Sequence, residues 1–315
     1  MKNTLDKLYD LKSFDGAKEY FAMQDSIGGT ILARNLEHIS SEIFKQRIAG
    51  LSFLTASGIT VNNEGGYADT IKKLKESING DFANAGQATN GEGKISIGTE
   101  DDSISVFYKE ASSSWSELEL EKASLQNRNL PASMVSAHDE KYKQNIDKIG
   151  YLGNGTKTDG LLNNAGFTAN ASGGAFSTLT AKEMYDEVAA VIVDQRGGVL
   201  NDEIFSANMI AVHPATFNLL SKTFLDTTGG MTTVRMALET TMNVTFVQTA
   251  KAEIAGVKRL VVYSSERQAM QMRIPVPLKL YNQFTQGSKH SIESMFGVAG
   301  LDVLENDAGR ILTGV

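Results

Sequence analysis

The sequence predicts an α+β protein with a small central sheet, and three observations lead to that prediction. Residues 130–149 follow one long amphipathic helical pattern, residues 58–114 are rich in glycine and partly alternate as strands do, and residues 180–274 mix helical and strand patterns. Helix, strand, two helices and then further strands form an order typical of an α+β domain. The chain has 315 residues, enough for one large domain or two medium ones with real cores.

The long helical pattern is the most regular feature of the chain. Pro131 lies in its first turn, where a missing backbone N–H costs nothing. Gly150 and Gly153 are expected to end it, since glycine tolerates the left-handed geometry of a helix stop. The apolar face recurs every three or four residues, at Met134, Val135, His138, Tyr142, Ile146 and Ile149.

The N-terminal third divides into two unlike segments. Residues 1–57 show apolar residues at helical spacing, which suits either a helical hairpin or an extended arm. In residues 58–114, the runs 95–97 and 104–108 alternate as strands, with a turn expected at 98–102. A structureless loop of this length is unusual inside a compact domain, so a protruding β-hairpin is predicted. Residues 67–78 suit either a helix or a strand of that hairpin.

The remaining elements follow from local signals. Trp115, the single tryptophan, is expected to be a packing anchor at the base of the hairpin. Thr180 and Glu183 form a capping-box pattern that opens a helix, and Pro214 is expected to begin another. Residues 167–179 resemble a linker. A third helix is expected at 232–242. Strands are expected at 209–212, 243–249, 259–263, 270–274 and 309–311, and a strand pair at 291–304.

Composition and motif searches limit the chemistry. The formal net charge is −7, which argues against a sequence-independent nucleic-acid binder, and the absence of cysteine excludes disulfides and thiolate catalysis. The chain lacks a signal-peptide core, and its apolar run 188–193 is far short of the roughly 20 residues of a membrane helix. Residues 153–158 hold glycines and a Lys-Thr pair, but without P-loop spacing or a preceding strand.

The other chemical signatures are absent as well. The sequence contains neither an H-E-x-x-H nor a G-x-S-x-G motif, and the acidic run 100–102 is read as a solvated hairpin tip. No histidine pairs with another within a helical turn; the histidines are His38, His138, His213 and His290. We therefore expect no enzymatic activity, no metal and no cofactor.

The end of the long helix carries a family resemblance. The segment Ile149-Gly150-Tyr151-Leu152-Gly153, followed by Asp159-Gly160-Leu161-Leu162-Asn163, resembles the major capsid proteins of tailed bacteriophages, which have the Hong Kong-type capsid fold. The resemblance implies an N-terminal arm (1–57), an extended β-hairpin loop (58–114), a peripheral domain with the long spine helix (115–198), an axial domain with the small central sheet (199–284), and a return strand of the peripheral domain (285–315).

The resemblance also implies a function and partners. It implies self-assembly, through hexamers and pentamers, into an icosahedral head shell that encloses the DNA genome. A separate scaffolding protein, a portal protein and non-specific contact with packaged double-stranded DNA are implied, with no membrane and with assembly in the bacterial host cytoplasm. We expect the subunit interface to include Ile95, Ile97, Ile104, Val106, Trp115, His138 and Tyr142.

Other functions stay open at this point. Some relatives link a hairpin lysine to an asparagine of a neighbour, but Lys94, Lys109, Asn282 and Asn306 match no such motif, so that activity is not carried over. An encapsulin-type shell around enzyme cargo has the same fold. A soluble α+β enzyme with an unrecognised site is the alternative from another class.

Overall fold

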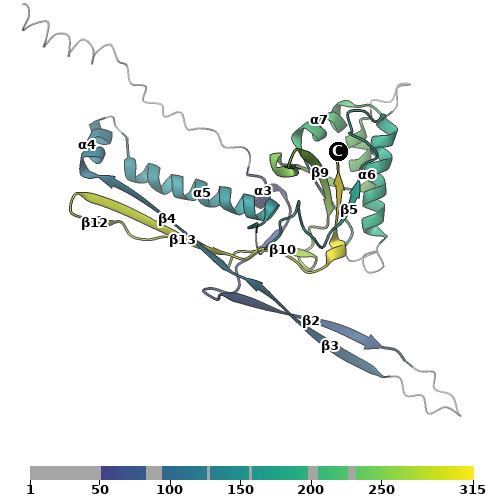
Figure 1. Cartoon of the computed structure of the whole chain (residues 1–315), viewed down its shortest axis with the longest axis horizontal. Coiled ribbons are helices and arrows are strands. Elements are labelled where there is room, and N and C mark those ends of the chain that lie inside the picture. The colour runs from purple at the N-terminus through teal and green to yellow at the C-terminus, as the bar shows by residue number, and fades with distance from the viewer. Residues whose placement is uncertain (1–50, 83–93, 126–127, 156–157, 198–204, 226–231) are drawn as a thin grey trace, which may run out of the picture. The chain divides into compact units, whose positions relative to one another are not determined.

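A computed structural model describes residues 51–82, 94–125, 128–155, 158–197, 205–225 and 232–315 (Figure 1). The chain divides into two compact units, one of residues 1–46 and 118–129 and the other of residues 47–117 and 130–315. The described part of the first unit consists of residues 118–125 of helix α4 (Glu117–Leu125) and of residues 128–129, where the Arg128 N–H donates to the Ala123 carbonyl. The predicted arm, residues 1–57, lies outside the described residues up to residue 50.

The predicted hairpin is formed by β2 (Thr70–Gly80) and β3 (Ile95–Ser105), which pair antiparallel along their whole length. The turn expected at 98–102 is wrong, because these residues lie inside β3. Asp102 pairs across the hairpin with Lys73, and Glu100 pairs with Lys75. Opposite charges placed directly across a strand pair stabilise it. The acidic residues 100–102 therefore lie within a paired strand opposite lysines, and not at a solvated hairpin tip.

The long helix α5 (Leu130–Leu152) packs on one face of an antiparallel sheet. That sheet joins β4 (Phe107–Ser116) to β13 (Lys289–Val298), which also pairs with β11 (Val276–Leu280) and β12 (Phe284–Gln286). Figure 1 shows α5 lying along β4 and β13. A smaller three-stranded sheet has the order β1 (Thr60–Asn62), β10 (Met270–Arg273), β14 (Gly300–Val303). The strand pair expected over 291–304 corresponds to β13 and β14, which lie in different sheets.

The segment after α5 closes the end of that helix. The Leu161 and Leu162 N–H groups donate to the carbonyls of Gly150 and Tyr151, and the Asn163 side chain donates to the Leu152 carbonyl. These bonds satisfy carbonyls that a helix end leaves open. A Cβ on Gly160 would lie 2.3 Å from the Leu152 nitrogen, so only glycine fits there. The Gly-Leu-Leu-Asn motif is therefore a helix stop.

The short helix α3 (Phe53–Ala56) joins the same core. Its Phe53 ring is 1% exposed and meets Tyr151 edge to face, with ring centroids 5.1 Å apart. The buried Asp147 carboxylate on α5 accepts a hydrogen bond from the Phe53 N–H at 2.8 Å and another from the Lys251 ammonium. Phe53 is therefore held by both its ring and its backbone.

The central sheet has the strand order β5 (Thr168–Ala171), β15 (Gly309–Thr313), β9 (Val257–Tyr263), β6 (Met209–Val212), β7 (Thr245–Gln248), with β8 (Glu253–Ile254) paired to β9. The expected linker 167–179 therefore contains a strand, β5, which is recruited by parallel pairing with β15. Short 3₁₀ turns lie at η1 (Ala250–Ala252) and η2 (Asn306–Ala308).

Three helices accompany the central sheet, and two of them begin where the sequence predicts. Helix α6 (Ala181–Arg196) opens with the Thr180–Glu183 capping box, and α7 (Pro214–Lys222) begins with Pro214 after the N-cap His213. Helix α8 (Val234–Met242) completes the set. Side chains from α6 and α8 form one apolar core with the sheet, while α5 and the other sheets contribute to a second core.

Candidate functional site

The described histidines do not form a catalytic or metal-binding group. His138 and His290 lie near the α5-covered sheet, and His213 caps α7. His38 lies outside the described residues. Within the described ranges, no three His, Asp or Glu side chains gather as a metal site requires. None of the helices in those ranges is long and apolar enough to cross a membrane.

His138 clamps α5 onto the sheet below it. Its Nδ1 lies 2.6 Å from the Ser294 hydroxyl on β13, and its Nε2 lies 2.9 Å from the Ser113 hydroxyl on β4. One turn later, the Tyr142 ring meets Phe296 edge to face, with centroids 5.0 Å apart. Both imidazole nitrogens are thus occupied by the chain itself, which is the arrangement of a structural histidine.

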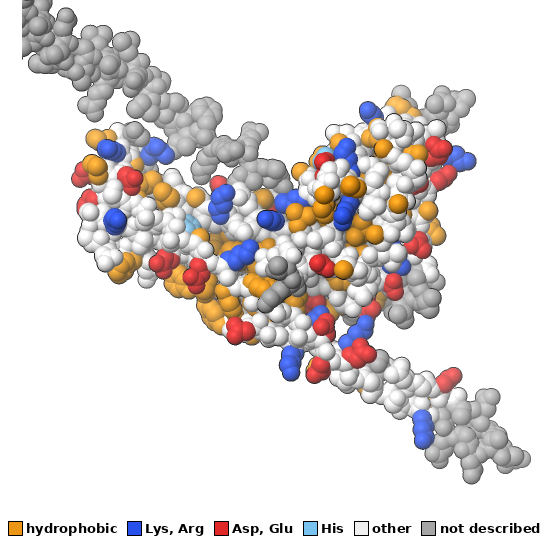
Figure 2. Space-filling model, viewed as in Figure 1, with side chains coloured by type: hydrophobic (Ala, Val, Ile, Leu, Met, Phe, Trp, Pro, Cys, Tyr) orange, Lys and Arg blue, Asp and Glu red, His pale blue; other side chains and the backbone are white. Residues whose placement is uncertain are grey.

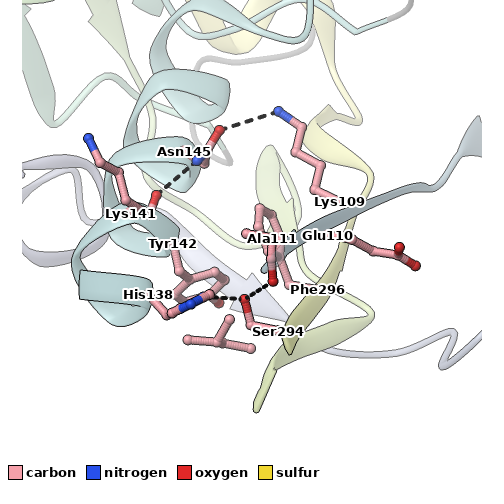
Figure 3. Close-up of a pocket in the computed structure, with 10 residues that line it drawn as sticks. Lys109, Glu110, Ala111, His138, Lys141, Tyr142, Asn145, Ser294 and Phe296 are labelled. Atoms are coloured by element: carbon pink, nitrogen blue, oxygen red, sulfur yellow. Dashed lines mark hydrogen bonds between the residues drawn. The ribbon is translucent and has the colours of Figure 1, made fainter. Parts of the chain in front are cut away.

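A cavity of about 280 Å³ opens beside this clamp, between α5 and the strands (Figure 3). The Lys109 ammonium donates to the Asn145 amide oxygen at 3.5 Å, while the Glu110 carboxylate points away from the helix. Burial lowers the pKa of Lys109, and the charge of Lys148 lowers it further. Two titratable side chains line the cavity close to α5. His138 is already hydrogen-bonded to two serines, and Lys109 has the neutral Asn145 amide as its partner. The two do not form the coupled acid and base of a hydrolytic site.

The structure separates the predicted interface residues into two groups. Ile95 and Ile97 lie on β3 with 54% and 66% of their surface exposed. Val106, Trp115 and His138 are less than a tenth exposed in the single chain. A side chain without free surface has little area to bury against a neighbour. Ile104 and Tyr142 are half-buried.

Trp115 is a packing anchor as the sequence suggests, but the predicted place at the base of the hairpin is wrong. Its ring stacks against His290, with centroids 6.1 Å apart, and only 2% of the residue is exposed. It lies near the end of β4 away from the hairpin, where β4 pairs with the start of β13. The tryptophan therefore joins two strands within the subunit.

One face of the hairpin carries four exposed apolar side chains, interspersed with the charged residues Lys72, Glu76 and Asp101. The register places Ile78 opposite Ile97, and Ile95 opposite Gly80, on the same face as Leu74. Leu74 and Ile78 are 71% and 78% exposed. Leu74 and Ile78 are absent from the predicted interface because residues 67–78 suit either a helix or a strand. Their spacing of four residues fits one face of a strand as well, since every second residue lies on the same face.

A second group of exposed apolar side chains lies on the α5-covered sheet and its β11–β12 connection. It comprises Leu280, Tyr281 and Phe284, which are 42%, 48% and 63% exposed. Figure 2 shows hydrophobic side chains gathered along this side of the sheet, whereas charged side chains are more prominent along the hairpin in the same view. Exposed apolar patches of this kind mark interaction surfaces.

Comparison with known proteins gives one consistent result. The sequence model of the family described as "Major capsid protein" matches residues 83–315. The capsid of Myoviridae phage XM1 is 46% identical, with a TM-score of 0.82, and the match covers 90% of this chain and 98% of that one. No curated protein matches.

More distant structures share the fold. The capsid of an empty GTA particle is 15% identical with a TM-score of 0.64, covering 92% of this chain and 97% of that one. A structure from Mycobacterium phage Ogopogo is 14% identical with a TM-score of 0.56, covering 88% and 96%.

Proposed function

The chain belongs to the major capsid protein family, and from that premise we propose how its copies assemble. Family membership indicates a structural role in the virion capsid of a tailed phage. An encapsulin-type shell is not favoured, because the matching family and the 46% identical structure are those of capsids and of a phage. We infer that many copies, grouped as hexamers and pentamers, close into an icosahedral head shell around the DNA genome.

The observation that carries this proposal is the apolar face of the hairpin. Leu74, Ile78, Ile95 and Ile97 are 54–78% exposed and lie on one face of a strand pair. Such a face is stable in water only at a cost, which contact with a neighbouring subunit would remove. Burying these four side chains would contribute on the order of 5 kcal/mol before the entropy cost of association. A closed lattice repeats that modest contact at every subunit.

The proposal is tested by placing a charge on the apolar face. Ile97→Asp should raise the protein concentration needed for assembly by about tenfold or more, because the contact would have to bury an unpaired carboxylate. Ser96→Asp is the matched control, since Ser96 lies one residue away on the opposite face. Electron microscopy of the purified chain, produced alone and with its neighbouring genes, measures shell yield. Equal yields from the two variants would refute the role of this face.

The partners are proposed on the same basis. Assembly in the host cytoplasm would use a separate scaffolding protein and a portal protein, and the shell would contact packaged double-stranded DNA without sequence preference. The net charge of −7 supports weak contact, because a lining without a strong positive field holds phosphate loosely. DNA retention by opened shells should therefore be weak at all salt concentrations. Tight retention that falls steeply with added salt would contradict this.

A further inference from the structure

The hairpin joins the rest of its unit at a defined pivot. Strand β3 runs almost directly into β4, separated only by Val106, which is 8% exposed. The Val106 N–H donates to the Asp69 carbonyl at 2.9 Å, and the Tyr108 hydroxyl donates to the Ala68 carbonyl at 2.9 Å. These contacts hold the base of the hairpin in place, but they do not fix the direction in which the hairpin projects from the rest of the unit.

A buried ionic cluster lies just beyond that pivot. The Lys73 ammonium on β2 lies 2.5 Å from one oxygen of Asp302 on β14, and the Arg273 guanidinium on β10 lies 2.6 Å from the other oxygen. The side chains of Asp302, Arg273 and Lys73 are 1%, 9% and 13% exposed. Desolvated charges persist only with close partners and good geometry, so this contact is specific in direction.

A second ion pair reinforces the first. Lys75 contacts Glu305 at 2.7 Å, and Lys73 also reaches Asp102 across the hairpin at 3.0 Å. The register puts Lys73 and Lys75 on the face opposite Leu74. The charged face of the hairpin is thereby turned toward the β10–β14 sheet, and its apolar face is turned away.

The cluster is not needed to form the hairpin. Eleven cross-strand pairs hold β2 to β3 whether or not Lys73 reaches Asp302. Arg273 also stays paired with Asp302 when Lys73 is absent, because it binds the other carboxylate oxygen. The contact of Lys73 with Asp302 therefore connects the hairpin to the β10–β14 sheet, and it does not hold either of them together.

We propose that Lys73, Asp302 and Arg273 form a latch that fixes the direction of the hairpin and so positions its apolar face for a neighbouring subunit. The assembly part of this inference rests on the proposed function of that face. The latch itself is a property of the single subunit. Lys73 is a positioning residue, since it acts through the direction of the strand pair and lies on the face opposite the apolar contact.

The absence of cysteine makes the latch directly measurable. Spin labels on Ser96→Cys, in the hairpin, and Gln268→Cys, in the exposed turn before β10, report the distance between the two parts in the unassembled full-length chain. Lys73→Met should raise the population of displaced hairpins by about tenfold, as expected for losing a charged hydrogen bond. Lys73→Arg, which keeps the charge, should retain the original distribution.

Lys72→Met is the matched control, since Lys72 points to the opposite face of the same strand and makes no ion pair among the residues that the structure describes. A distance distribution that is unchanged in Lys73→Met, or equally changed in Lys72→Met, would overturn the latch.

Shell assembly by Lys73→Met and Lys73→Arg separates the two proposals, whereas Lys72→Met is a control for the distance alone because Lys72 shares a face with Leu74. Displaced hairpins together with fewer shells support the latch and its role in assembly. Displaced hairpins with normal shell yield support the latch but refute that role. Fewer shells with an undisplaced hairpin refute the latch and leave the apolar-face proposal to the Ile97→Asp test.

Discussion

Replacing Gly150 with alanine sets helix propensity against packing. Gly150 lies in the last turn of α5, where alanine is favoured over glycine by about 1 kcal/mol on propensity alone. A Cβ at this position would lie 2.5 Å from ring atoms of Phe53. Phe53 cannot easily retreat, because its ring is buried against Tyr151 and its N–H is bonded to Asp147.

The two effects differ in size. Inserting a methyl group into a well-packed core costs about 1–3 kcal/mol. After the propensity gain is subtracted, Gly150→Ala should destabilise the subunit by up to about 2 kcal/mol. Phe53→Ala alone should cost about 3–5 kcal/mol, because it leaves a cavity. In that background the added methyl group has room, so Gly150→Ala should stabilise by up to about 1 kcal/mol.

Urea unfolding of the unassembled chain measures these free energies. Trp115 is the single tryptophan and is 2% exposed, so its fluorescence reports the loss of the core without an added label. The decisive quantity is the change of sign between the two backgrounds, a double-mutant cycle. Stabilisation by Gly150→Ala in the wild-type background, or the same cost in both backgrounds, would refute the packing argument.

Three further predictions concern single elements. Hydrogen bonds from the Thr180 N–H and hydroxyl hold the pKa of Glu183 below its usual value of 4.5. The capping box therefore adds stability above pH 4.5 and loses it as the pH falls through the lower pKa of the folded state. Glu183→Gln should flatten the acid side of a plot of urea midpoint against pH, and an unchanged plot would contradict this. Asn243 ends α8 with φ of 50°, so Asn243→Gly should be neutral or slightly stabilising and Asn243→Val should cost about 1–2 kcal/mol, as measured by thermal unfolding. Lys251→Met leaves the buried Asp147 carboxylate with the Phe53 N–H as its remaining described donor. The variant should lower the free energy of unfolding in urea by about 2 kcal/mol. Lys258→Met removes a lysine without a described ion pair and should change this free energy little.

Elements defined by nearby residues could be predicted from the sequence. The helix 130–149 has an apolar face at regular spacing, and the structure extends it only to Leu152. The Thr180–Glu183 box and the start at Pro214 are confirmed because a cap depends on residues within three or four positions of one another. The family resemblance began at a helix stop that is equally local, since the Gly160 N–H donates to the Asn163 side chain and that side chain donates to the Leu152 carbonyl.

Strand partners and burial required the tertiary structure. Residues 98–102 have the composition of a turn, yet they continue a strand because Lys73 and Lys75 lie opposite them. Residues 168–171 have a linker composition, yet they pair with β15, about 140 positions later. Of the predicted interface residues, Ile95 and Ile97 keep free surface while Trp115 and His138 do not, because distant strands cover the latter two.

The sequence by itself determined the long helix, the starts of α6 and α7 and the family to which the chain belongs, because periodicity, capping and short motifs act over a few residues. Only the tertiary structure decided which strands pair, which apolar residues face water, and how the hairpin is held. The cluster of Lys73, Arg273 and Asp302 illustrates the reason. Its members are separated by up to 229 positions in the chain. Their charges interact strongly only because folding brings them together and removes them from water.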